Sequence, residues 1–154
     1  MEVCLDHLQL HPAGKWIKHY HLASRTFMER LLRPYDLGST QWMVLFHLVQ
    51  DGAMPQRDFI ELLKVEKPTL SDIVSALVRK GFIDQSPDPS NKRQRVLSLT
   101  EQGRQLWERL PNPIVVMRDI AFDGVDEQTL DLIAEVLQTA TERLEHHNFG
   151  DRET

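Results

Sequence analysis

The chain has 154 residues, of which 41% are hydrophobic and 27% are charged, as expected of a globular domain with a real core. Its formal net charge of −5 excludes a uniformly basic surface for nucleic acid. The charge is unevenly spread, because residues 64–95 hold seven Lys and Arg against four Asp and Glu, a local balance of +3 that leaves −8 for the rest. The sequence therefore predicts one basic face on an otherwise acidic protein.

The single cysteine, Cys4, allows no intramolecular disulfide, which favours a reducing compartment. No apolar run approaches the roughly 20 residues that a membrane-spanning helix needs. The N-terminus lacks the basic and then apolar pattern of a signal peptide. We therefore expect a cytoplasmic protein that makes no contact with a membrane.

The first predicted element is a long helix over about residues 14–33. Its apolar and small residues step by three and four along one face, which is a heptad-like seam. A proline at position 34 ends it, because the residue before a proline avoids helical geometry. The seam consists of Ile17, Tyr20, Ser24, Phe27 and Leu31.

Two shorter helices are predicted next. Ser39 is a candidate cap for a helix that runs to about Gln50. Pro55 is expected to start a second short helix, and residues 64–66 form a tight turn after it. The side chains expected to face inward are Trp42, Leu45, Phe46, Val49, Phe59, Ile60 and Leu63.

The stretch Val65–Gly81 predicts a helix with two different faces. Leu70, Ile73, Val74 and Leu77 recur at the spacing of one buried face. The other face is polar and short-chained, as in a helix that enters the major groove of DNA, although an ordinary amphipathic surface helix has the same pattern. That outer face carries Lys67, Pro68, Thr69, Ser71, Asp72, Ser75 and Arg79.

A β-hairpin is predicted directly after this helix. Residues 82–86 have the composition of a strand, residues 87–92 are rich in turn formers, and residues 95–99 alternate with period two. Its tip holds Lys92, Arg93 and Arg95. A helix-turn-helix followed by such a hairpin is typical of a winged DNA-binding lobe.

The C-terminal third predicts helices broken by prolines. Thr100 is a candidate cap for one helix, Pro111 and Pro113 interrupt the chain, and a helical segment resumes over residues 114–122. Asp126 is a candidate cap for a last helix that runs to about residue 147. This helix carries a second heptad-like seam, formed by Leu130, Ile133, Leu137, Ala140 and Leu144.

The two seams predict a homodimer, because a two-fold pair of chains buries both and places two recognition helices on one side. The alternative is a helical layer within a monomer. The predicted fold is mainly α with a small β-hairpin wing. It comprises a winged helix-turn-helix lobe at about residues 36–100 and a helical dimerisation layer at about residues 12–34 and 104–147, within one domain over 1–154.

The sequence resembles the MarR family of winged helix-turn-helix transcriptional regulators. The resemblance extends over roughly residues 14–147 and is most specific at the wing. There the chain matches an Asp-Pro-x-(Asp/Asn)-(Lys/Arg)-Arg run and a strand ending in Leu-Thr-x-x-Gly. The residues that carry it are Asp88-Pro89-Ser90-Asn91-Lys92-Arg93 and Leu97-Ser98-Leu99-Thr100-Glu101-Gln102-Gly103.

The resemblance implies a homodimer whose recognition helices enter successive major grooves of a pseudo-palindromic operator, usually for repression. It implies that Arg93 inserts into the flanking minor groove, where narrow A·T-rich DNA concentrates negative potential. Lys92 and Arg95 are then expected on phosphates. Asp72 departs from the pattern, since many family members have an arginine there. The broken helix at Pro111 and Pro113 is a second departure.

The resemblance also implies a crevice for a small aromatic or phenolic acid. Aromatic walls and a cation suit such a carboxylate. The candidates are Trp16, His19, Tyr20, Arg25, Trp42 and His47. For each of them, taken singly, the residue type favours a plain packing or surface position over ligand contact.

No enzymatic motif is present, whether a phosphate-binding glycine loop, a nucleophile elbow or a metalloprotease helix. No cofactor is expected, and the seven histidines lack the spacing of a structural zinc site. The pair His7 and His11 has helical spacing, and Cys4 has no neighbouring cation to activate it as an oxidation sensor. The competing function is a winged-helix module for protein contact, a non-DNA-binding regulator or antirepressor, which Asp72 and the net charge favour.

Overall fold

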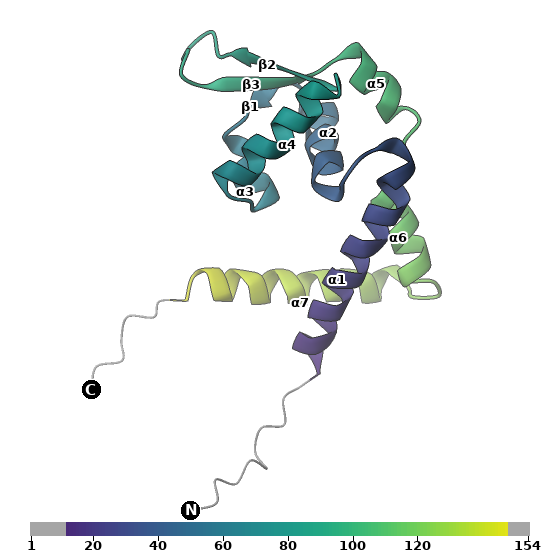
Figure 1. Cartoon of the computed structure of the whole chain (residues 1–154). Coiled ribbons are helices and arrows are strands. Elements are labelled where there is room, and N and C mark those ends of the chain that lie inside the picture. The colour runs from purple at the N-terminus through teal and green to yellow at the C-terminus, as the bar shows by residue number, and fades with distance from the viewer. Residues whose placement is uncertain (1–11, 148–154) are drawn as a thin grey trace, which may run out of the picture. The chain divides into compact units, whose positions relative to one another are not determined.

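The computed structural model describes residues 12–147, so Cys4, His7 and His11 lie outside the described residues. The chain divides into two compact units between Met117 and Arg118. Within residues 12–147, no helix has the length and apolar character needed to cross a membrane. The predicted fold class is confirmed: the described chain is mainly helical, with one small antiparallel sheet (Figure 1).

The first unit begins with the long predicted helix, α1 (Ala13–Leu32), and a 3-10 turn, η2 (Arg33–Tyr35). Arg33, before the proline, keeps helical φ and ψ of −52° and −42°, contrary to the expectation for that position. Pro34 lies in the first turn of η2, and its missing N–H ends the regular helix. Asp36 then adopts a left-handed conformation with φ of 54°, which Asp tolerates better than most residues. The chain reverses here into α2 (Ser39–Asp51).

The predicted cap of α2 is wrong by one residue, because Gly38 and not Ser39 occupies the N-cap. Ser39 is the first helical residue, and its hydroxyl donates to the Glu29 carboxylate of α1 at 2.7 Å. The Ser39 backbone N–H points to the same carboxylate at 3.4 Å. A side chain from another helix therefore supplies the acceptor that a local cap would otherwise provide.

The winged lobe follows as β1 (Met54–Pro55), α3 (Asp58–Leu63), α4 (Lys67–Arg79), β2 (Ile83–Pro87) and β3 (Arg95–Leu99). The expectation that Pro55 starts a helix is wrong, because it lies in β1 and the helix begins three residues later. Lys64 forms the predicted turn with φ of 50°. Pro68 lies in the first turn of α4, where its missing N–H costs no helical hydrogen bond.

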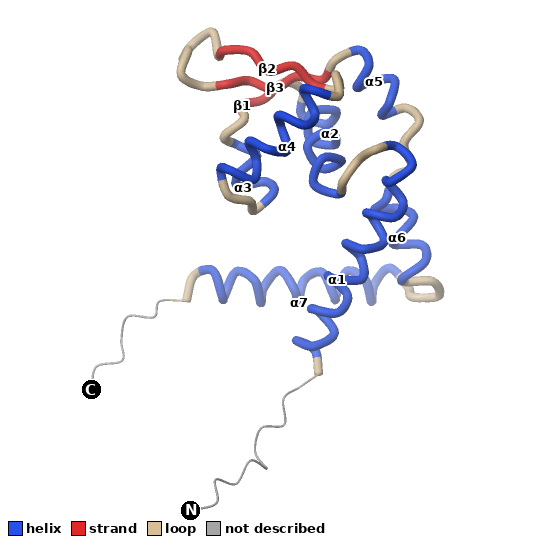
Figure 2. The backbone as a smooth tube through the Cα atoms, in the orientation of Figure 1, coloured by secondary structure: helices blue, strands red, loops and turns tan. Residues whose placement is uncertain are grey.

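The sheet has the order β1-β3-β2 and is antiparallel throughout. Ile83 pairs with Leu99 and Pro87 with Arg95, which confirms the hairpin; Met54 pairs with Leu97 and adds a third, very short strand. The helices α2, α3 and α4 lie on one side of this sheet (Figure 2). We call the β2–β3 hairpin, residues 83–99, the wing.

The core of the first unit is apolar throughout, and α2 supplies more of it than predicted. Trp42 and Leu45 are fully buried as expected, but Val44 and Leu48 are also buried, whereas Phe46 and Val49 are half-buried. Trp42 stacks on Phe46 and on Trp107 with ring centroids 5.3 and 5.5 Å apart. On α4, Leu70, Val74 and Leu77 are buried and Ile73 is half-buried.

Thr100 and Gly103 join the end of α4 to the next helix, α5 (Glu101–Trp107). The Thr100 hydroxyl accepts from the Gly103 N–H at 3.0 Å, which confirms the predicted cap, and donates to the carbonyl of Gly81 at 2.6 Å. A β-carbon at Gly103 would overlap the carbonyl oxygen of Phe82, so only glycine fits there. The Leu-Thr-x-x-Gly motif is therefore structural.

The proline break is confirmed, because α5 ends at Trp107 and α6 (Pro113–Ala121) begins after it. The last helix, α7 (Glu127–Glu145), is capped by Asp126, whose carboxylate accepts from the Thr129 N–H at 2.9 Å. None of the residues of α7 is buried. Leu130 of the predicted seam is half-buried. The other four seam residues are exposed to solvent, and Leu144 is 77% exposed.

The two hydrogen bonds of Thr100 predict the effect of its removal. Thr100→Ala should lower the free energy of unfolding of the first unit by about 1–2 kcal/mol, because α5 loses its cap and the Gly81 carbonyl loses its donor. Thr100→Ser keeps the hydroxyl and should retain most of the stability. Urea unfolding followed by tryptophan fluorescence measures both; equal loss in the two variants would contradict the prediction.

Candidate nucleic-acid interface

The outer face of α4 is polar and open to solvent. Six of its seven predicted site residues are exposed, and Ser71 is half-buried. The exposed ones are Lys67, Pro68, Thr69, Asp72, Ser75 and Arg79. Because Leu70, Val74 and Leu77 anchor the opposite face in the core, this surface is held rigidly outward.

The tip of the wing is ordered by its own Asp and Asn side chains. Asp88 accepts from the backbone N–H and the hydroxyl of Ser90 at 2.7 and 2.6 Å. Asn91 accepts from the Arg93 N–H at 3.2 Å through its side-chain oxygen. These short-range bonds fold the turn and leave Lys92 and Arg93 exposed.

The hydrogen bonds at Ser90 hold the pKa of Asp88 below its usual value of 3.8, with the Ser90 hydroxyl as the main cause. The positive charge of Arg57 contributes in the same direction. Asp88 is therefore charged at neutral pH and acts as a fixed acceptor within the turn. Within residues 88–93, Asp88 and Asn91 therefore build the turn, and the turn exposes the cations Lys92 and Arg93.

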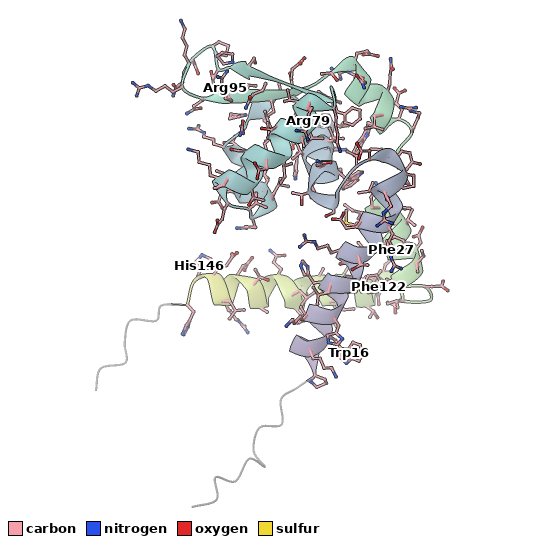
Figure 3. The ribbon with its side chains drawn as sticks, viewed as in Figure 1. Trp16, Phe27, Arg79, Arg95, Phe122 and His146 are labelled. Atoms are coloured by element: carbon pink, nitrogen blue, oxygen red, sulfur yellow. The ribbon has the colours of Figure 1, made fainter. Side chains whose placement is uncertain are left out.

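A hollow of about 270 Å³ lies between the wing and the helix-turn-helix. Four cations line it: Arg57 ahead of α3, Lys67 at the start of α4, and Arg93 and Arg95 from the wing. The remaining lining residues are Gln56, Ile60, Leu70, Gln85 and Gln94. Figure 3 labels Arg95 on the wing and Arg79 on α4. The hollow combines four positive charges with amide groups, which suits a phosphate oxygen.

Residues 37–94 match the model of the MarR family. This segment contains α2, the helix-turn-helix and the wing up to its tip. Over this segment the chain is similar to the MarR family.

The chain is also similar to individual proteins over more of its length. The chain is 26% identical over 130 residues to the HTH-type transcriptional repressor IacR of Pseudomonas putida, which covers 84% of this chain and 78% of that protein. A MarR variant from E. coli, solved in complex with operator DNA, superposes with a TM-score of 0.75 at 20% identity, over 84% of this chain and 94% of that one.

BpsR of Bordetella bronchiseptica, whose DNA binding is regulated by 6-hydroxynicotinic acid, superposes with a TM-score of 0.73 at 19% identity. That match covers 84% of this chain and 98% of BpsR. At these identities the two solved structures show a shared fold.

The six predicted ligand residues are not gathered in one place. Trp16, His19 and Tyr20 line a shallow apolar hollow on α1 together with Leu22 and Ala23. Trp42 is fully buried in the core, so it is placed away from any described hollow. His47 faces Asp51 on its own helix, with 3.4 Å between Nδ1 and the carboxylate.

Arg25 alone of these six lies beside a second hollow, of about 620 Å³. Its walls come from α1, α2, the end of α3 and the start of α4. The lining residues are His21, Ser24, Arg25, Met28, Ser39, Thr40, Met43, Leu62, Leu63, Lys64, Val65 and Thr69. Sequence reasoning missed most of them, because they come from four segments that only the folded chain brings together.

Asp72 is exposed on α4, and within residues 12–147 its carboxylate forms no ion pair or hydrogen bond. Lys67, Arg79 and Lys92, three cations of the predicted DNA-binding surface, therefore do not neutralise it. Arg57 is the most important residue that sequence reasoning missed. A backbone bond of 2.8 Å from the Gln56 N–H to the Arg95 carbonyl holds this segment against the wing.

The Asp88 turn predicts a change in its titration. Ser90→Ala should raise the pKa of Asp88 toward 3.8, because the largest cause of its lowering is removed. The pKa of Asp88 is lower in the folded protein than its ordinary value of 3.8. The charged carboxylate therefore stabilises the turn fully at a pH above about 3.8, and this stabilisation is lost as the pH falls through the folded pKa. Carboxyl titration by NMR measures the pKa; an unchanged value in the variant would contradict this assignment.

Proposed function

We propose that the protein is a sequence-specific DNA-binding transcriptional regulator that acts in the cytoplasm as a homodimer. The recognition helix α4 reads a major groove, and the wing reaches the minor groove beside it. The observation that carries this proposal is the four-cation hollow between α4 and the wing, beside an exposed polar helix face. Repression of a pseudo-palindromic operator is the mode proposed, in keeping with the similarity to IacR, a transcriptional repressor. The role is regulatory rather than catalytic.

The DNA contacts divide by chemistry. Thr69, Ser71 and Ser75 on α4 carry hydroxyl groups that donate to phosphates or base edges, and Pro68 packs on a thymine methyl. Arg79, Lys92 and Arg95 contact phosphates, and Arg93 enters the minor groove. The exposed carboxylate of Asp72 repels phosphate, so α4 reads bases through small donors while the wing supplies much of the affinity.

The proposed dimer is supported by the surface of α7. A helix of 19 residues with no buried side chain leaves its apolar seam without an intramolecular partner in its unit. Ile133 is 40% exposed, and Ile17 on α1 is 48% exposed. A two-fold contact between copies buries such faces, which gives residues 12–34 and 104–147 their proposed role as the dimerisation layer.

The DNA-binding proposal predicts which cations shape the salt dependence. First, selection from a random DNA library identifies the operator. Arg57→Gln and Arg93→Ala should each weaken operator binding and reduce the slope of log K against log salt by about one per protomer, because each removes a contact to DNA charge. Fluorescence anisotropy across a salt series measures the slopes.

The matched control is Arg104→Gln on α5, an exposed arginine at the other end of β3 from the wing tip. It should leave the slope unchanged. A wild-type chain that selects no DNA from the library would overturn the proposal in favour of a protein-interaction module. Equal slopes in all three variants would show that the hollow does not meet DNA.

The 620 Å³ hollow is the proposed effector site. Arg25 and Lys64 supply positive charge, Met28, Met43 and Leu63 supply an apolar wall, and hydroxyls of α2 complete it. This chemistry suits a small aromatic or phenolic acid. The 6-hydroxynicotinic acid that regulates BpsR is itself a small aromatic acid. Because Thr69 of α4 also lines the hollow, a bound acid lies against the recognition helix.

The effector proposal predicts a charge requirement. Arg25→Gln should weaken binding of 4-hydroxybenzoate at least about tenfold, since a hydrogen bond to a charged group contributes about 1.5–3 kcal/mol. The neutral 4-hydroxybenzamide should bind the wild type weakly. Isothermal titration calorimetry measures both. Equal affinity for the acid and the amide would show that the hollow does not select a carboxylate.

A further inference from the structure

A polar cluster surrounds the residue that follows the recognition helix. The ammonium nitrogen of Lys80 lies 3.2 Å from the Asp36 carboxylate and 3.2 Å from the side-chain oxygen of Gln41. It also donates to the backbone carbonyl of Asp36. The Lys80 side chain is only 21% exposed. Three acceptors from the start of α2 and the turn before it therefore hold this lysine.

The same segment is tied to α1. Gln41 accepts from the Gly38 N–H at 3.3 Å with the oxygen that also meets Lys80. One residue further along, the Glu29 carboxylate of α1 holds Ser39 at 2.7 Å. The side chains of Glu29, Asp36, Gln41 and Lys80 line one common hollow of about 360 Å³. A continuous set of polar contacts thus joins α1, through the α1–α2 turn, to the C-terminal end of α4.

The neighbouring cation behaves differently. Arg79 is exposed, and among residues 12–147 it forms no ion pair. Its charge is available to a ligand, whereas that of Lys80 is already partnered. Sequence alone does not distinguish the two, because both are basic residues at the end of one helix.

We propose that Lys80 is a positioning residue for DNA binding that acts by fixing the C-terminal end of α4 to the α1–α2 turn. The proposal rests on the proposed function of α4 as the recognition helix. Base readout requires the helix at a defined angle in the groove, whereas phosphate contacts tolerate small rotations. Losing the Lys80 contacts therefore reduces binding to the operator more than binding to unrelated DNA.

The test compares adjacent cations in the full-length chain. Fluorescence anisotropy gives Kd for the selected operator and for a scrambled duplex across salt, with wild type, Lys80→Met and Arg79→Gln. Lys80→Met should raise the operator Kd about five- to tenfold, as for loss of a partly buried charged hydrogen bond, with scrambled binding and salt slope unchanged. Arg79→Gln should weaken both duplexes and reduce the slope by about one per protomer.

A second variant removes the other partner. Asp36→Asn keeps a residue that accepts the left-handed turn conformation and removes the charge that faces Lys80. It should lower operator affinity in the same direction, and combining it with Lys80→Met should add little, because residues of one network are not additive. If Lys80→Met fails to fold in a thermal scan, Asp36→Asn carries the comparison.

Three outcomes overturn the proposal while the proposed function stands. A slope reduction in Lys80→Met equal to that of Arg79→Gln would make Lys80 a phosphate contact. An unchanged operator Kd in a folded Lys80→Met would show that the contacts do not position α4. Full additivity with Asp36→Asn would show that Lys80 acts elsewhere. A wild type that binds no DNA would instead overturn the proposed function, and this proposal with it.

Discussion

The burial of α2 is the constraint on which the first unit depends. This helix packs against α1, α3, α4, α5 and β3, so five other elements take their position from it. Its buried side chains are Trp42, Val44, Leu45 and Leu48, and no polar or charged residue is buried among the described residues. An apolar, close-packed centre of this kind transmits displacement because it has little free volume to absorb it. The exposed face of α4 and the wing are therefore presented by one rigid support.

Much of the fold follows from the sequence where a residue acts on its own neighbours. Thr100 and Asp126 cap the helices that they begin, and the period of two marks the wing strands. The predictions from sequence are wrong where a residue distant in the chain determines the local structure. The N-terminus of α2 is satisfied by Glu29, ten residues from Ser39, so a local capping rule selects the wrong residue. The strand at Pro55 has only two residues and exists because β3 pairs with it, so no local period marks it.

The candidate site shows the same division. The motif at the wing tip is readable because Asp88 and Asn91 fold a local turn and leave the next two residues outward. Arg57 belongs to no motif and reaches the hollow because the chain around Gln56 pairs with Arg95. Trp42 is buried as the helical pattern predicts, and that burial removes it from the candidate ligand residues. The structure of a short segment can be predicted from its own residues, whereas the meeting of segments that are distant in the sequence cannot.

The proposed pairing of α7 with a second copy has a consequence for how the protein responds to its own concentration. Most of the stability of a helix in a protein comes from packing of its amphipathic face, so the order of α7 depends on whatever covers its apolar seam. With a second copy as that cover, folding of the C-terminal segment and association of chains become one equilibrium, governed by mass action. The fraction of chains able to span two half-sites then rises more steeply than in proportion to chain concentration. A regulator built in this way carries a threshold in its own expression level.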